Sequence, residues 1–125
     1  MCGIAGYVGD RESADVLVDA LSKLEYRGYD SAGIAVFDHG NIKVKKCKGR
    51  LANLVEKMDE EGKPQGHVGI GHTRWATHGE PSDINSHPHG NKRVTIVHNG
   101  IIENYKKLKD FLIGEGYSFA SETDT

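Results

Sequence analysis

The sequence predicts a single α+β domain built on antiparallel strands, and three observations support this prediction. A chain of 125 residues has room for one ordinary domain, because domains hold about 100 to 200 residues. Short apolar runs alternate with segments whose apolar residues recur every three or four positions, a mixture typical of strands and helices in one fold. The turn-rich residues 38–41 join two apolar runs, which indicates a hairpin and therefore an antiparallel pair.

In the first half of the chain, short apolar runs predict strands at residues 4–8, 32–37 and 42–47. A helix is expected at residues 14–24, where the apolar positions follow the helical period and Asp10 is available as an N-cap. A second helix is expected from Leu51 to Met58, and Gly62 marks its end.

In the second half, strands are expected at residues 68–72, 94–98 and 117–120, and a third helix at residues 105–114. The polar stretch 77–92 separates the first two of these strands and is too long for a plain turn. Loops of this length are usually functional or mobile.

Charge and hydropathy exclude several classes of partner. Sixteen basic and 18 acidic residues give a net charge of −2, so no overall field attracts a polyanion or an anionic membrane, and neither partner is expected. The basic run at residues 43–50 is typical of a solvated edge strand. No apolar stretch reaches the roughly 20 residues that span a bilayer, and the N-terminus lacks a signal peptide's charged and apolar regions, so a cytoplasmic location is expected.

Cys2 is the strongest candidate for catalysis. The chain has two cysteines, too few for a disulfide framework, so Cys2 and Cys47 are expected to be thiols in a reducing compartment. If Met1 is removed, Cys2 carries both its thiol and the free α-amine, whose ordinary pKa of about 7.7 to 8.0 suits a general base. Nucleophile and base then belong to one residue. The alternative is a small, buried, unreactive side chain.

Asn99 and Gly100 form a second candidate, because they follow the strand expected at residues 94–98. A side-chain amide and a glycine N–H exposed together at a strand end can donate two hydrogen bonds to an oxyanion. The alternative is an ordinary Asn-Gly turn.

Arg74 is a third candidate, because residues 71–79 end a strand in an arginine, an indole, a hydroxyl and an imidazole. Arginine binds a carboxylate through two parallel hydrogen bonds, and the long loop that follows favours a substrate lid. The alternative places Trp75 in the core and Arg74 on the surface.

Two weaker signals remain. Residues 27–33 lie between the first helix and the next strand, and they are either functional or a simple helix cap and turn. His72, His78, His87 and His89 suggest a metal, but no C-x-x-C or H-E-x-x-H spacing accompanies them, so no metal site is expected.

Together these segments resemble the class II glutamine amidotransferases. The matching segments follow the family's order: Met-Cys-Gly-Ile at the N-terminus, then residues 24–33, 71–79, 98–100 and 121–125. Residues 26–30 and 75–78 resemble the isomerising glutamine:fructose-6-phosphate aminotransferases, or glucosamine-6-phosphate synthases. They resemble the phosphoribosyl-pyrophosphate amidotransferases, the alternative among enzymes, less closely.

The resemblance implies an N-terminal-nucleophile fold, a four-layer αββα sandwich with antiparallel sheets, and it implies hydrolysis of L-glutamine. Cys2 would attack the side-chain carboxamide, Asn99 and Gly100 would stabilise the oxyanion, and water would hydrolyse the γ-glutamyl thioester to glutamate. The ammonia would serve glucosamine-6-phosphate synthesis from fructose 6-phosphate. The resemblance implies no cofactor.

The resemblance also implies a substrate-binding set, which comprises Arg74, Trp75, Thr77, His78, Asp124 and Arg27. Arg74, with Thr77 and the backbone near His78, would bind the α-carboxylate of glutamine, and Asp124 would bind its α-ammonium. Trp75 would belong to the loop that closes over the site, and Arg27 would lie near the nucleophile.

The resemblance covers about half of a glutaminase domain, so residues 1–125 are expected to be the N-terminal part of one. The sugar isomerase domain of the full-length enzyme, its expected partner, is absent. Half a sandwich exposes apolar sheet surface, so weak stability or self-association is expected, and the enzyme is expected to be a homo-oligomer. The alternative outside the enzymes is a non-catalytic module for glutamine binding or assembly.

Overall fold

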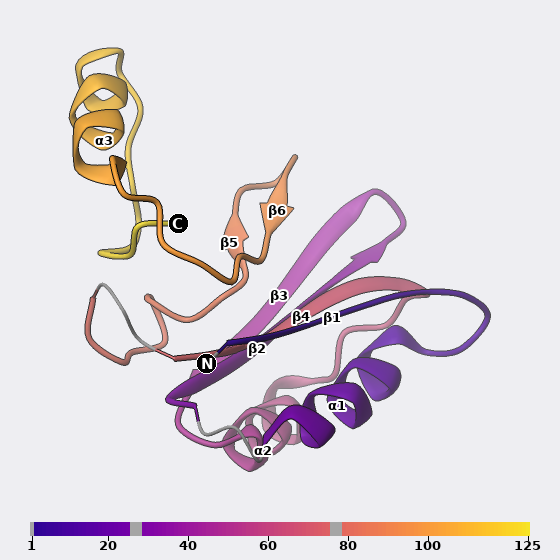
Figure 1. Cartoon of the computed structure of the whole chain (residues 1–125). Helices are drawn as coiled ribbons and strands as arrows, with labels where there is room; N and C mark the ends of the chain where they lie inside the picture. The colour runs from indigo at the N-terminus through magenta and orange to yellow at the C-terminus, as the bar shows by residue number, and fades with distance from the viewer. Residues whose placement is uncertain (1, 26–28, 76–78) are drawn as a thin grey trace.

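The main feature of the computed structural model is one antiparallel four-stranded sheet (Figure 1). The structure describes residues 2–25, 29–75 and 79–125. Across the sheet the strands lie in the order β1 (Gly3–Val8), β4 (Val68–Arg74), β2 (Ser31–Asp38) and β3 (Asn41–Lys48). The β2–β3 pair is the expected hairpin, and each neighbouring pair is antiparallel. The strands predicted in the first half of the chain are therefore confirmed.

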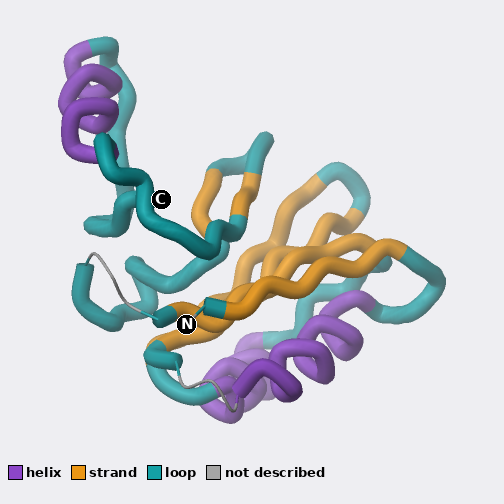
Figure 2. The backbone as a smooth tube through the Cα atoms, viewed as in Figure 1, coloured by secondary structure: helices purple, strands orange, loops and turns teal. Residues whose placement is uncertain are grey.

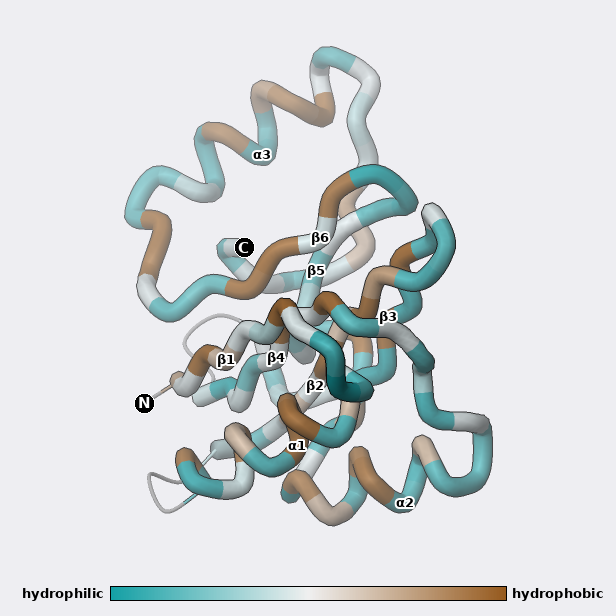
Figure 3. Tube along the Cα trace, turned by 90° about the vertical axis from the view of Figure 1, so that its right-hand side faces the viewer, coloured by the Kyte–Doolittle hydropathy of each residue, from teal (hydrophilic) through white to brown (hydrophobic). Residues whose placement is uncertain are grey.

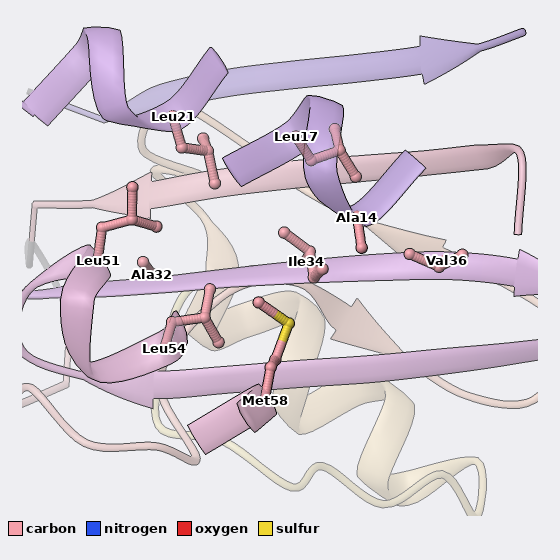
Figure 4. Close-up of a cluster of buried hydrophobic side chains, with 9 residues drawn as sticks. All are labelled: Ala14, Leu17, Leu21, Ala32, Ile34, Val36, Leu51, Leu54 and Met58. Atoms are coloured by element: carbon pink, nitrogen blue, oxygen red, sulfur yellow. The ribbon is translucent and has the colours of Figure 1, made fainter. Parts of the chain in front are cut away.

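Two helices, α1 (Ser13–Leu24) and α2 (Leu51–Glu61), cover one face of this sheet. Figure 4 shows their apolar side chains directed at β2. Leu17 and Leu21 of α1 and Leu54 of α2 are fully buried against Ile34 of β2. Their spacing of three and four residues places them on one side of each helix, which explains why these segments are helices in this fold.

The face of the sheet turned away from the helices is apolar at one end. Val68 pairs with both Val8 and Phe37, so the three side chains point to the same face. This face is opposite the helices, because Val36, the neighbour of Phe37, belongs to the helix-side core. Val68, Val8 and Phe37 are 41%, 79% and 49% exposed. We call these three residues the open apolar face.

The other end of the same face is covered by residues 84–90. Lys46 of β3 points to this segment, and its Nζ donates to the carbonyls of Ile84 (3.3 Å), Ser86 (2.9 Å) and Pro88 (3.2 Å). A Cβ at Gly33 of β2 would lie 2.0 Å from the carbonyl oxygen of His87. The close approach of the segment to the sheet therefore requires glycine at that position.

Beyond this segment lies a second sheet of two strands, β5 (His89–Gly90) and β6 (Thr95–Ile96), followed by α3 (Tyr105–Gly114). Figures 1 and 2 show the succession of helices, large sheet, small sheet and helix. Apolar positions recur along α3 (Figure 3), but none of its residues is buried. Among the described residues, no helix has the length and apolar character needed to cross a bilayer.

Two local predictions are wrong, and a third is confirmed only in part. Asp10 does not cap α1, whose N-cap is Glu12 and which has no side-chain cap hydrogen bond. Residues 117–120 form no strand, because no other described segment supplies a hydrogen-bond ladder for them. The strand expected at 94–98 is reduced to β6, since the main chain of His98 bonds to side chains instead of a neighbouring strand.

Two buried histidines, His72 and His87, and the half-buried His89 join the large sheet to the segment above it. The rings of His72 and His87 are stacked with centroids 4.0 Å apart, and the ring of His89 meets that of His87 edge-on at 4.5 Å. Burial lowers the pKa of His72 and of His89 to about 4 and that of His87 to about 2. The nearby Arg74 guanidinium also lowers the pKa of each of the three rings, so the rings are neutral at physiological pH.

Self-association should depend on the open apolar face. We expect the chain to form concentration-dependent oligomers in analytical ultracentrifugation, and the Val8→Lys/Phe37→Lys double variant to shift toward monomer, because two buried ammonium groups would oppose contact. Ala52→Lys, at an exposed position of α2, is the control and should not change the distribution. A monomer at every concentration with a sharp melting transition would contradict the prediction.

The buried histidines predict a loss of stability in mild acid. Above pH 6.5, their ordinary pKa, the rings are neutral in both states; between 6.5 and about 4 the unfolded chain binds protons that the folded chain does not. The free energy of unfolding should therefore fall by about 1.4 kcal/mol per pH unit for each histidine. The free energy of unfolding at each pH is measured by urea unfolding, monitored through the fluorescence of Trp75, the single tryptophan.

His87→Asn should reduce this pH slope, whereas His67→Asn, which replaces an exposed histidine, should not. An unfolding free energy that stays constant across this pH range would show that the three rings are not neutral in the folded chain.

Candidate active site

The register of β1 and β4 brings Cys2 to the end of β4. Gly3 pairs with Thr73, so residue 2 and residues 74–75 meet at the same edge of the sheet. The Cys2 Sγ accepts a hydrogen bond from the Trp75 N–H (3.2 Å) and lies 3.6 Å from the Trp75 carbonyl oxygen. These two contacts hold the Cys2 sulfur against the main chain of Trp75 at the end of β4.

The second cysteine is in a different environment. Cys47 lies on β3 on the helix side and packs against the core. Desolvation raises the pKa of its thiol, and Asp83 adds to the effect. Burial and the nearby Asp83 carboxylate therefore disfavour the nucleophilic thiolate form of Cys47.

Asn99 reaches the same edge from the segment after β6. Its side-chain Nδ2 donates to the main-chain carbonyl of Cys2 at 3.2 Å, across 97 residues of sequence. A Cβ at Gly100 would lie 2.9 Å from Nε2 of His98, so the backbone at this position approaches the imidazole closely. The structure thus brings together the nucleophile candidate and the amide donor that the sequence proposes separately.

Arg74 is buried at the end of β4, with 3% of its surface exposed. Its Nη2 donates to the carbonyl of Gly79 (2.8 Å) and its Nη1 to that of Glu80 (3.4 Å), and Oδ1 of Asp30 lies 3.9 Å from Nη1. The guanidinium therefore anchors the start of the long loop and places a cation on the same face as Cys2. The alternative of a surface arginine is excluded by this burial.

Asp124 approaches from the last residues of the chain. Its Oδ2 accepts a hydrogen bond from the main-chain N–H of Ile102 at 2.7 Å. The neighbouring Thr125 Oγ1 lies 3.1 Å from Nδ1 of His98. The C-terminal residues thus dock on the segment that carries Asn99 and bring a carboxylate to the same region.

Of the four remaining predicted site residues, the structure describes one, Trp75. Trp75 follows β4 and is 53% exposed, so it is not a core residue. Arg27, Thr77 and His78 lie outside the described residues.

Sequence reasoning missed the role of the buried histidines. His72 and His87 bond to the main chain of His98, directly before Asn99. The alternation of β4 carries a signal for this, since residues 72 and 74 must point to the same face of a strand. Among the residues that the structure describes, no group of three or more His, Cys, Asp or Glu side chains is arranged to hold a metal.

The arrangement suits acyl transfer on a small zwitterion. The Asn99 amide donor bonds to Cys2, the buried Arg74 cation lies on the same face of the sheet, and the Asp124 carboxylate is bonded to Ile102, three residues after Asn99. A thiol beside an amide donor can attack a carbonyl carbon and stabilise the resulting oxyanion. A cation and an anion can together bind the carboxylate and ammonium of an amino acid.

Comparison with known proteins agrees with this chemistry. The family model of the glutamine amidotransferase domain matches residues 58–125. Glutamine–fructose-6-phosphate aminotransferases (isomerizing) of Clostridium tetani, Clostridium perfringens and Pyrococcus horikoshii are 63%, 65% and 54% identical to the chain over all of its length. The chain spans about a fifth of the length of these relatives, 21% in each case.

Solved structures show the same fold. The glutamine phosphoribosylpyrophosphate amidotransferase of B. subtilis, solved with ADP and GMP, matches all of this chain and 27% of its own with a TM-score of 0.82 at 27% identity. The allosteric regulatory enzyme of purine biosynthesis matches 97% of this chain and 27% of its own with a TM-score of 0.81 at 27% identity.

These similarities confirm the expected α+β fold of the N-terminal-nucleophile amidotransferases. The resemblance to class II glutamine amidotransferases is confirmed as well. Because the family model covers more than half of its residues, the chain belongs to the glutamine amidotransferase domain family.

Proposed function

We propose that the chain hydrolyses L-glutamine to glutamate and ammonia, with Cys2 as the nucleophile. The observation that carries this proposal is the contact of the Cys2 thiol with the Trp75 N–H, next to the Asn99 amide bonded to the same residue. Once Met1 is removed, the α-amine of Cys2 takes the thiol proton as sulfur attacks the amide carbon of glutamine.

The tetrahedral intermediate then breaks its C–N bond. The protonated α-amine gives its proton to the leaving nitrogen, which departs as ammonia and leaves a γ-glutamyl thioester. Water attacks the thioester, the amine accepts a proton from the water, and the C–S bond breaks to release glutamate and the thiol. Asn99 Nδ2 and the Gly100 N–H donate to the oxyanion in both halves of the reaction.

Glutamine binds through its two charged groups. Arg74, with Thr77 and the backbone at His78, takes the α-carboxylate, and Asp124 takes the α-ammonium. The burial of Arg74 supports this role, because a desolvated guanidinium binds a carboxylate more strongly than an exposed one. Trp75 closes over the bound substrate, and Arg27 completes the substrate-binding set.

The ammonia serves glucosamine-6-phosphate synthesis from fructose 6-phosphate. Identities of 54 to 65% to glutamine–fructose-6-phosphate aminotransferases support this assignment over a phosphoribosyl-pyrophosphate amidotransferase, at 27%. In this proposal residues 1–125 are the N-terminal part of a glutaminase domain that acts with a C-terminal sugar isomerase domain, in a cytoplasmic homo-oligomer.

Covalent labelling tests the nucleophile. A diazoketone analogue of glutamine should add one label to the chain at Cys2 and none at Cys47, after intact-mass measurement shows that Met1 is absent. Cys47→Ala should label normally, and Cys2→Ala should not label. Label that persists in Cys2→Ala would reject the assignment of Cys2.

Replacing Asn99 by Ala tests the oxyanion donor. In the 125 residues joined to the remainder of the Clostridium tetani relative, Asn99→Ala should lower kcat for glutamine hydrolysis by about 10² to 10³, because one donor of this kind stabilises the transition state by about 2.7 to 4 kcal/mol. The Kd for glutamine should change little. If binding is lost while kcat persists, Asn99 binds substrate and is not an oxyanion donor.

A further inference from the structure

The main chain of His98 is bonded on both sides by buried imidazoles. His72 Nε2 lies 2.9 Å from the His98 carbonyl oxygen, and His87 Nδ1 lies 3.4 Å from the His98 nitrogen. The two rings are stacked at 4.0 Å, so they act on the peptide groups as one unit. We call these two rings and the main chain of His98 the histidine clamp.

Each hydrogen bond in the clamp requires one particular neutral tautomer. A carbonyl oxygen only accepts, so His72 carries its proton on Nε2; the His98 N–H only donates, so Nδ1 of His87 is unprotonated. A second proton on His87 would direct an N–H at the N–H of His98 and break the bond. Burial keeps the pKa of both rings far below neutrality, and Arg74 contributes in the same direction.

Both rings are themselves fixed to the large sheet. His72 is a fully buried residue of β4, two residues before Arg74. His87 belongs to the segment that Lys46 holds through three carbonyls. The clamp therefore transmits the rigid geometry of the sheet to a segment that has no strand partner of its own at His98.

We propose that His72 and His87 are positioning residues for amide hydrolysis, which hold the His98 peptide and thereby place the Asn99 carboxamide and the Gly100 N–H against Cys2. This inference rests on the proposed glutaminase function. Its physical basis is the short reach of an oxyanion donor: a displacement of about 1 Å from the productive position can cost about 10² in rate.

Paired substitutions distinguish the effect of the clamp's hydrogen bonds from the effect of the packing of its rings. In the 125 residues joined to the remainder of the Clostridium tetani relative, His72→Leu and His87→Leu should each lower kcat about 10- to 100-fold with little change in the KM for glutamine. His72→Gln keeps a donor near the position of Nε2, and His87→Asn keeps an acceptor near that of Nδ1. Both should recover most of the lost kcat.

His89→Leu is the matched control. Its ring belongs to the same cluster, but its hydrogen bond goes to Thr123 at 3.2 Å and not to His98. Removing this ring should leave kcat near that of the unsubstituted protein. An equal loss of kcat in His89→Leu, or no recovery in His72→Gln and His87→Asn, would overturn the proposal in favour of a general packing role.

Hydrogen exchange gives a second readout that does not depend on activity. In the same protein, a peptide covering residues 97–101 should exchange faster in His87→Leu, because the His98 N–H loses its acceptor, and at the normal rate in His89→Leu. If neither variant changes the exchange, the clamp does not hold this segment. If the unsubstituted protein hydrolyses no glutamine while exchange responds as expected, the glutaminase proposal fails and the clamp remains as a structural device.

Discussion

The antiparallel register between β1 and β4 is the constraint on which the candidate site depends. Pairing of Gly3 with Thr73 brings the first residues of the chain to the place where β4 ends, so Cys2 contacts Trp75 and lies on the face that carries Arg74. Because β2 also holds β4 in register, a shift by one residue would turn β1 over and direct Cys2 toward the helix side of the sheet, away from Arg74. The hydrophobic pattern prevents such a shift, because it would also expose the core positions of β1, Ala5 and Tyr7.

The two faces of the large sheet have different tasks. The helix side is filled by leucines and other apolar residues and supplies the packing that holds the strands together. The opposite side holds the chemistry at one end, where Arg74 and the buried imidazoles are satisfied by carbonyls and by each other. Neutral histidines beside a buried guanidinium provide hydrogen bonds without adding like charge, which a second cation at this position would do. The open apolar face at the other end has no cover in the described part of the chain.

Local patterns predicted those elements whose stability comes from their own residues and from close neighbours in sequence. The β2–β3 hairpin, α1 and α2 are present as expected, because turn chemistry and helical spacing are local properties. The strand expected at 94–98 is shorter because His98 finds its hydrogen bonds in two side chains, from β4 and from the covering segment. The apolar run 117–120 is extended in character, but a strand also needs a partner, and periodicity within one segment cannot supply it.

The sequence by itself determined the chemical inventory of the site: a cysteine beside the chain's amino terminus, an Asn-Gly pair after an apolar run, an arginine at a strand end and a late aspartate. Only the tertiary structure decided that Cys2 and Asn99 meet, and that His72 and His87 bond to the peptide groups directly before Asn99. The physical reason is distance along the chain. Asn99 and Cys2 are separated by 97 residues, and only the register of the sheet and the packing of buried rings on it bring them into contact.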